Sequence, residues 1–264
     1  MLKITSIKVT NNYVLILLSN KEKYKISEDD FFENKYKAKQ QLSEKDLKQL
    51  AIISNFHNAY LKALNKLKYK DRSEWEIRHL MYEDFELNKG QVDKIINKLK
   101  RYGFIDDVRY IKEFYERSNR KYWGYNKVKS KLVDVRISSK LISENLTYNY
   151  QQQLDLATNF LNKEVKKIKN KTQKQVKNKL YSKLRYRGFK NDVIKVAVDT
   201  IEIAYDQKLE EKLLKKDFDK AYRRYQKKAE GYELRNKVFA FLARRGFRFD
   251  DINKILDEME NENE

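Results

Sequence analysis

Basic and aromatic side chains are interleaved in three segments of the chain, 120–125, 163–187 and 223–225. Lysine and arginine contact phosphates and aromatic rings stack on bases, so such segments are typical of surfaces that bind nucleic acid. Segment 163–187 is the densest, with eleven basic residues and one acid, a local charge of +10. A solvated helix face over packed tyrosines is the alternative interpretation of each segment. The predicted contacts to an acidic partner are Arg120, Lys121, Tyr125, Lys174, Lys177, Lys179, Lys183, Arg187, Arg223, Arg224 and Arg245.

No arrangement of catalytic residues accompanies these segments. The chain has no cysteine that could bind a metal ion together with His57 and His79, and the spacing of the two histidines matches no known set of metal ligands. The six glycines form neither a phosphate-binding loop nor a dinucleotide motif. The acidic pairs 106–107 and 250–251 stand at expected helix starts, so we interpret them as caps rather than as general bases. The sequence therefore predicts a protein that is not an enzyme and that holds no metal or cofactor.

The elements that position the basic residues include an internal repeat. Residues 176–194 and 234–252 align without a gap and share eight identities. In each copy, apolar residues at helical spacing are followed by basic residues, a glycine and a phenylalanine. Gly188 and Gly246 are therefore expected to adopt the left-handed conformation that ends a helix. The repeated unit is a helix, a glycine turn and a second helix.

The residues around these turns predict how the neighbouring helices begin and end. Asp192 and Asp250 follow the glycines and are expected to cap the next helices. Arg136 stands where an earlier copy would carry its glycine, so we expect that junction not to use a left-handed cap. Capping boxes are predicted at Ser43 with Asp46, Ser73 with Glu76, and Thr172 with Gln175.

The order of these patterns predicts a mainly α fold. Residues 1–26 alternate in a way that indicates a small three-stranded β-meander, and helical spacing begins after it. We expect four tandem three-helix repeats in an elongated, curved array. The predicted segments are a β-rich head at 1–42, helical repeats at 43–106, 107–148, 149–205 and 206–258, and an acidic tail at 259–264.

Composition limits the partners and the compartment. The chain has 59 basic and 39 acidic residues, a net charge of +20, which favours nucleic acid or an acidic protein surface. There are no cysteines, so neither disulfides nor thiolate metal sites are possible, and a cytoplasmic location is expected. The longest apolar run, 13–18, is too short to cross a bilayer, so no membrane association is predicted.

Several of these motifs, in this order and spacing, resemble the RecX family of recombination regulators. The match covers about residues 57–258, and the β-rich head and fourth repeat resemble the longer members from low-GC Gram-positive bacteria. Arg136 departs from the family pattern, which has glycine there. The residues that carry the resemblance are Arg72, Ser73, Glu76, Gly103, Asp107, Arg109, Gly188 and Gly246.

The resemblance implies a regulator without catalytic residues that acts in DNA repair and recombination. Such a protein binds the RecA recombinase filament on single-stranded DNA and limits its ATP turnover and strand exchange. The resemblance also implies contact with single-stranded and double-stranded DNA, and we expect a monomer. The alternative is a helical repeat protein that binds DNA or RNA alone, without a recombinase.

Overall fold

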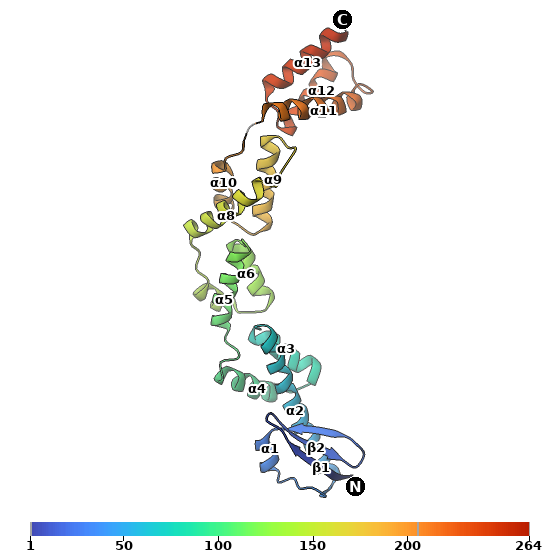
Figure 1. The fold of residues 1–264 in the computed structure, drawn as a ribbon, viewed down its shortest axis with the longest axis vertical. Helices are drawn as coiled ribbons and strands as arrows, with labels where there is room; N and C mark the ends of the chain where they lie inside the picture. The colour runs from blue at the N-terminus through green and yellow to red at the C-terminus, as the bar shows by residue number, and fades with distance from the viewer. Residues whose placement is uncertain (1, 205, 264) are drawn as a thin grey trace. The chain divides into compact units, whose positions relative to one another are not determined.

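The structure is a computed structural model that describes residues 2–204 and 206–263, with side chains described as far as residue 259. The chain divides into two compact units. Unit 1 comprises Met1–Phe114 and Lys131–Leu146, and unit 2 comprises Tyr115–Ser130 and Thr147–Glu264. Figure 1 labels most of their helices and strands.

Unit 1 contains the sheet, which has four antiparallel strands within the described residues, in the order β3-β2-β1-β4. They are β1 (Leu2–Val9), β2 (Val14–Leu18), β3 (Lys23–Ile26) and β4 (Gln41–Leu42). The predicted meander is confirmed as β1 to β3, whereas β4 was not predicted. β4 has only two residues, paired with Leu2 and Lys3, so it is too short to show an alternating pattern.

The rest of the described chain is helical, and the predicted mainly α fold with a β-rich head is confirmed. The thirteen described helices are α1 (Glu28–Glu33), α2 (Glu44–Tyr69), α3 (Glu74–Phe85), α4 (Lys89–Arg101), α5 (Asp107–Arg120), α6 (Tyr125–Asp134), α7 (Ser139–Asn145), α8 (Tyr150–Val165), α9 (Gln173–Tyr186), α10 (Asn191–Thr200), α11 (Gln207–Tyr225), α12 (Gly231–Arg245) and α13 (Phe249–Asn263).

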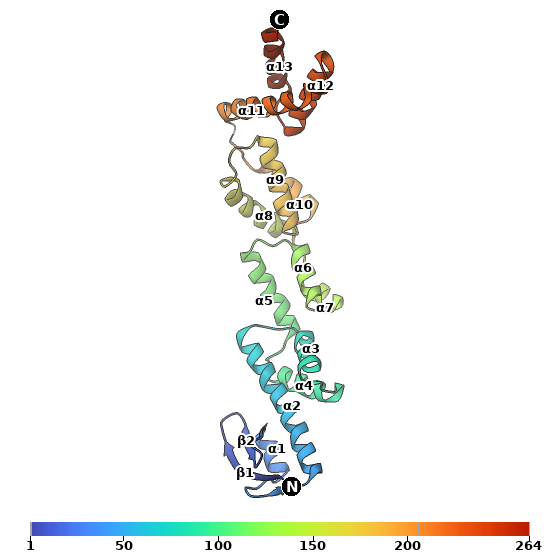
Figure 2. The same cartoon turned by 90° about the vertical axis from the view of Figure 1, so that its right-hand side faces the viewer.

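Three sets of three helices each enclose an apolar core. In unit 1, α2, α3 and α4 bury Ile77 and Ile96 together. In unit 2, α8, α9 and α10 pack around Leu180, and α11, α12 and α13 pack around Leu242 and Ile252. Figure 2 shows α8, α9 and α10 side by side. The boundary between unit 1 and unit 2 falls within α5 and again within α6. The predicted repeat 107–148 is therefore divided between the two units, and its bounds remain a prediction.

The start of α3 shows the predicted capping box. Ser73 Oγ accepts a hydrogen bond from the backbone N–H of Glu76 (3.2 Å), and the Glu76 carboxylate accepts one from the backbone N–H of Ser73 (3.0 Å). Arg72 holds the same carboxylate in an ion pair at 2.9 Å. Two donors at the helix start are thus satisfied by side chains, as the S-x-x-E spacing requires.

Other predicted caps are wrong in part or in full. Thr172 Oγ1 accepts from the backbone N–H of Gln175 (3.2 Å), but Gln175 Nε2 donates to the carbonyl of Arg245 (3.2 Å), so that box is half formed. Asp192 and Asp250 are the second residues of α10 and α13, not their caps. Inside the first turn their charge still stabilises the helix, through the positive end of its dipole.

The junction between α4 and α5 is fixed by the acidic pair that follows Gly103. Asp106 Oδ1 accepts from the backbone N–H of Arg109 (2.9 Å), and Arg109 Nη2 donates to the carbonyl of Gly103 (2.7 Å). Asp107 Oδ1 accepts from the backbone N–H of Glu74 (2.9 Å), which ties the start of α5 to the start of α3. Burial raises the pKa of Asp107. Asp106 therefore caps α5 as interpreted from the sequence, whereas Asp107 accepts from the backbone of α3 rather than from its own helix.

The glycine turns have the left-handed conformation, with φ of 69° at Gly103, 80° at Gly188 and 94° at Gly246. Two of them are also places of close approach. A β-carbon on Gly188 would lie 2.4 Å from the backbone nitrogen of Lys127, and one on Gly246 would lie 2.4 Å from the β-carbon of Lys174. A β-carbon on Gly103 would meet nothing within 4 Å.

The backbone conformation of Arg136 contradicts the expectation that this junction lacks a left-handed residue. Its φ is 58°, its N–H donates to the carbonyl of Val133 (2.8 Å), and the N–H of Ile137 donates to the carbonyl of Leu132 (3.2 Å). This is the hydrogen-bond pattern of the glycine turns. An L-residue can adopt the conformation at a cost of about 1–2 kcal/mol, so glycine is favoured there but not required.

Replacing Arg136 with glycine is therefore expected to raise the free energy of unfolding by up to ~1 kcal/mol, since relief of strain exceeds the entropy that glycine adds to the unfolded chain. Chemical denaturation of both proteins measures the difference. Arg136→Ala, which keeps the strain and removes the guanidinium 5.9 Å from the Trp75 ring centroid, isolates the side-chain contribution. A loss of more than ~1 kcal/mol in the glycine variant would contradict this account.

At three left-handed turns, the start of a helix from earlier in the chain packs against the turn. In each case the carbonyl just before the turn accepts a hydrogen bond from the residue that precedes the earlier helix. The starts of α3, α6 and α9 therefore contact the ends of α6, α9 and α12, respectively. Because the start of a helix is electropositive and its end electronegative, the contact is favourable. The pairs are Ser73 Oγ to Val135 O (2.8 Å) in unit 1, and Gly124 N to Arg187 O (2.8 Å) and Thr172 Oγ1 to Arg245 O (3.1 Å) in unit 2.

Candidate nucleic-acid and partner interface

All eleven predicted contact residues lie in unit 2. They differ in exposure and in the partners that hold them, and these partners decide which charges are available. Arg120, Lys121, Lys174, Lys179, Arg223 and Arg224 are exposed. Tyr125, Lys177, Lys183, Arg187 and Arg245 are half-buried.

Lys183 is held by the single acid of segment 163–187. Glu164, at the end of α8, forms ion pairs with Lys167 (2.7 Å) and with Lys183 of α9, and only 11% of its side chain is exposed. Hydrogen bonds from these two lysines lower the pKa of Glu164. Lys163 donates to the hydroxyl of Tyr122. Part of the predicted cationic contact is therefore used inside unit 2.

Arg187 and Arg245 also have internal roles. Arg187 Nη1 donates to the carbonyl of Lys121, and its guanidinium lies 4.1 Å from the ring centroid of Phe160. Arg245 lies 5.2 Å from the ring centroid of Phe241 and forms an ion pair with Asp217 at 3.7 Å. Both arginines hold neighbouring segments together, and their availability to an outside anion is reduced accordingly.

The aromatic residues of segment 120–125 form cation–π contacts. Lys127 Nζ lies 5.0 Å from the ring centroid of Trp123 and 4.3 Å from that of Tyr186, and Lys121 Nζ lies 5.4 Å from Trp123. Tyr186 is 81% exposed and offers a ring face to solvent. The ring of Tyr125 instead meets Tyr148 edge-on, with centroids 5.2 Å apart. Stacking faces and cations are thus adjacent at the start of α6.

Lys179 contributes to a shallow basic pocket between α9 and α12. The pocket has a volume of about 430 Å³, and its lining residues are basic or amide-bearing. Amides and cations together can hydrogen-bond phosphate oxygens. The lining residues are Lys171, Gln175, Asn178, Lys179, Arg244 and Arg245.

A regular set of cations on α11 was not predicted from the sequence, except for Arg224. Lysine or arginine occupies every fourth position from 208 to 228, and all six side chains are exposed. We name this set the α11 row; it consists of Lys208, Lys212, Lys216, Lys220, Arg224 and Lys228. The period of four was visible in the sequence, but α11 also contains four acids, which mask the row when charge is only summed.

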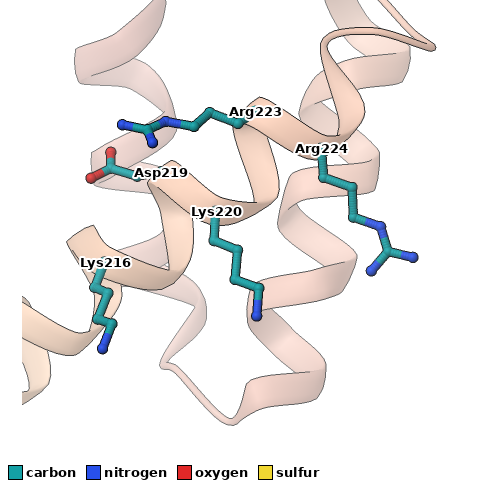
Figure 3. A pocket seen from close by; sticks show the side chains of 5 residues that line it. All are labelled: Lys216, Asp219, Lys220, Arg223 and Arg224. Atoms are coloured by element: carbon teal, nitrogen blue, oxygen red, sulfur yellow. The ribbon is translucent and has the colours of Figure 1, made fainter.

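Lys216, Lys220 and Arg224 of the α11 row line a pocket of about 570 Å³ together with Asp219 and Arg223 (Figure 3). Lys216, Lys220 and Arg224 extend toward one side of the helix in that view, whereas Asp219 and Arg223 extend toward another. Residues four apart lie on neighbouring turns of one helix face, which explains the common direction.

Neither histidine lies in a candidate catalytic or metal site. His57 is buried, and burial lowers its pKa. His79 stacks on Trp75 with ring centroids 4.9 Å apart. Among the described residues, no group of three histidine, aspartate or glutamate side chains is placed to hold a metal ion. Over the same residues, every helix is too short or too polar to span a membrane.

Comparison with known proteins gives a consistent result. Residues 210–256 match the family described as RecX, third three-helix domain. The chain is 30% identical over 268 residues to "Regulatory protein RecX" of Lactococcus lactis subsp. cremoris strain MG1363, covering 96% of this chain and 97% of the relative. It is 30% identical over 263 residues to "Regulatory protein RecX" of Streptococcus pneumoniae strain Taiwan19F-14, covering 97% and 99%.

A solved structure shares the fold. "Crystal structure of regulatory protein RecX" superposes with a TM-score of 0.56 at 22% identity, covering 75% of this chain and all of that one. Identity of 30% across nearly the whole length, together with the family match in the last three-helix set, decides the assignment. The chain belongs to the RecX family of regulatory proteins.

Proposed function

We propose that the protein binds the RecA recombinase filament on single-stranded DNA and lowers its rates of ATP hydrolysis and strand exchange. Family membership over 96% of the chain is the observation that carries the proposal. The protein would act as a monomer in the cytoplasm, through binding alone and without catalysis of its own. Its three-helix sets would provide the surface that contacts the filament.

The charge distribution of unit 2 supports this role. The exposed cations of α9 and α11 and the cation–aromatic contacts around Trp123 suit a partner that combines phosphates and acidic side chains. A filament of recombinase on DNA presents both. The same cations also favour the second candidate, a protein that binds nucleic acid without a recombinase.

An ATPase measurement tests the proposal. RecA on single-stranded DNA should hydrolyse ATP more slowly when the protein is added at up to equimolar amounts, and strand exchange should slow in parallel. Polylysine at the same total charge is the matched control, since it competes for DNA without recognising the filament. Unchanged hydrolysis, combined with equal affinity for single-stranded DNA in the presence and absence of RecA, would overturn the regulator and favour the second candidate.

A further inference from the structure

The α11 row is a regular series of exposed cations in unit 2 that winds slowly around the helix, by about 40° per step. Five of its members lie on α11 and Lys228 follows in the next turn. Within the described part of the chain, none of the six forms an ion pair with an acid, although four acids share the helix. From Lys208 to Arg224 the row is about 24 Å long, at 1.5 Å of rise per residue.

Three of the four acids of α11 have partners outside the row, which leaves the charges of the row available. Asp217 pairs with Arg245 of α12 at 3.7 Å. Glu210 Oε1 accepts from the backbone N–H of Gln173 (3.1 Å), and Glu211 Oε1 accepts from Gln207 Nε2 (3.0 Å). The fourth acid, Asp219, extends to a different side from the row in Figure 3. Lys216, Lys220 and Arg224 thus form a cationic side of the helix even though its net charge is modest.

The contrast with α9 shows that a period of four alone does not make such a face. Lys179, Lys183 and Arg187 also stand four residues apart. Lys183 is bound to Glu164, however, and Arg187 donates to the carbonyl of Lys121. A row interrupted in this way offers an outside anion only one of its three charges. Within the described residues, no member of the α11 row is bound to an acid or a carbonyl, and Arg224 lies 5.5 Å from the ring centroid of Tyr225.

The regular spacing of the row indicates its ligand. Neighbouring members are about 6 Å apart along the helix, a distance of the same order as that between phosphates of an extended strand. An acidic protein surface would match the row only if its own charges repeated at this interval over about 24 Å, at ~6 Å per step, whereas the phosphates of any single strand repeat along its whole length. A flexible single strand can follow a row that winds around the helix by about 40° per step.

We propose that the α11 row binds the phosphates of one single-stranded nucleic acid segment directly, without the recombinase. The inference rests on the proposed function in one respect: in the cell, the bound strand would be the single-stranded DNA on which the RecA filament forms. It also changes the expected location of the main contact, from the lysines of α9 to the first helix of the fourth repeat.

The test is the salt dependence of binding to a single-stranded oligonucleotide with no recombinase present. Changing Lys212, Lys216 and Lys220 to glutamine should flatten the slope of log affinity against log salt by about 2, at ~0.7 per lost contact with a single strand. The matched control changes Lys195, Lys215 and Lys254, three exposed lysines outside the row, to glutamine. It has the same net charge as the first variant and should keep the original slope.

Two further measurements separate folding from binding. A variant with Lys212, Lys216 and Lys220 changed to arginine keeps the charges and should keep the slope, and circular dichroism should show equal helix content in all variants. If the glutamine variant of the row keeps the original slope, or if the control loses as much, the assignment of the row to phosphates is wrong. Because this assay contains no RecA, its outcome is independent of whether the protein inhibits RecA ATP hydrolysis.

Discussion

Replacing Gly188 with alanine is expected to lower the free energy of unfolding of unit 2 by about 2–5 kcal/mol. Two costs combine. The left-handed backbone, with φ of 80°, costs an L-residue about 1–2 kcal/mol. The new β-carbon would also lie 2.4 Å from the backbone nitrogen of Lys127, and such overpacking typically costs about 1–3 kcal/mol. The neighbour is backbone and cannot move aside as a flexible side chain can.

Two other glycines separate these costs. Gly103 has φ of 69°, and a β-carbon there would meet nothing within 4 Å, so Gly103→Ala should cost about 1–2 kcal/mol from the backbone alone. Gly124 has no positive φ, but its β-carbon would lie 2.4 Å from the backbone nitrogen of Phe189, so Gly124→Ala reports the contact alone. Thermal and urea unfolding of the three variants measure the losses. Equal losses at Gly103 and Gly188 would show that the close approach does not contribute.

The helix boundaries were largely predictable, because they depend on local chemistry. Ser73 with Glu76 and the glycines at 188 and 246 carry their conformational preferences in their residue types. Arg136 shows the limit of this reasoning. The sequence predicts no left-handed turn there because glycine is absent, yet hydrogen bonds and the docking of α3 fix the same conformation on an arginine. Such a tertiary constraint leaves no sign in the local sequence.

The candidate interface was less predictable, because the availability of a charge depends on partners far away in the sequence. Lys183 is predicted as a contact from local charge density, but Glu164, nineteen residues earlier, binds it. The α11 row escapes prediction for the opposite reason. Its cations are interspersed with acids in the sequence, and only the folded structure shows that three of these acids have partners outside the row.

Replacing Ser73 with alanine is expected to lower the free energy of unfolding of unit 1 by about 2–4 kcal/mol. Loss of a side-chain cap costs about 1 kcal/mol. Ser73 is fully buried, however, and its hydroxyl also donates to the carbonyl of Val135 at 2.8 Å. Removing the hydroxyl leaves that carbonyl without its donor, which adds about 1–3 kcal/mol where water cannot take the place of the donor.

Ser43 provides the matched control, since it caps α2 with the same box. Its Oγ accepts from the backbone N–H of Asp46 (3.2 Å), and the Asp46 carboxylate accepts from the backbone N–H of Ser43 (3.0 Å), as at Ser73. Ser43 is exposed, and its hydroxyl donates only to Asp46 of its own turn. Ser43→Ala should therefore cost about 1 kcal/mol, the value of the cap. If both substitutions cost the same in urea unfolding, the hydrogen bond from Ser73 to Val135 does not stabilise the junction of α3 with α6; a larger loss at Ser73 assigns the difference to that bond.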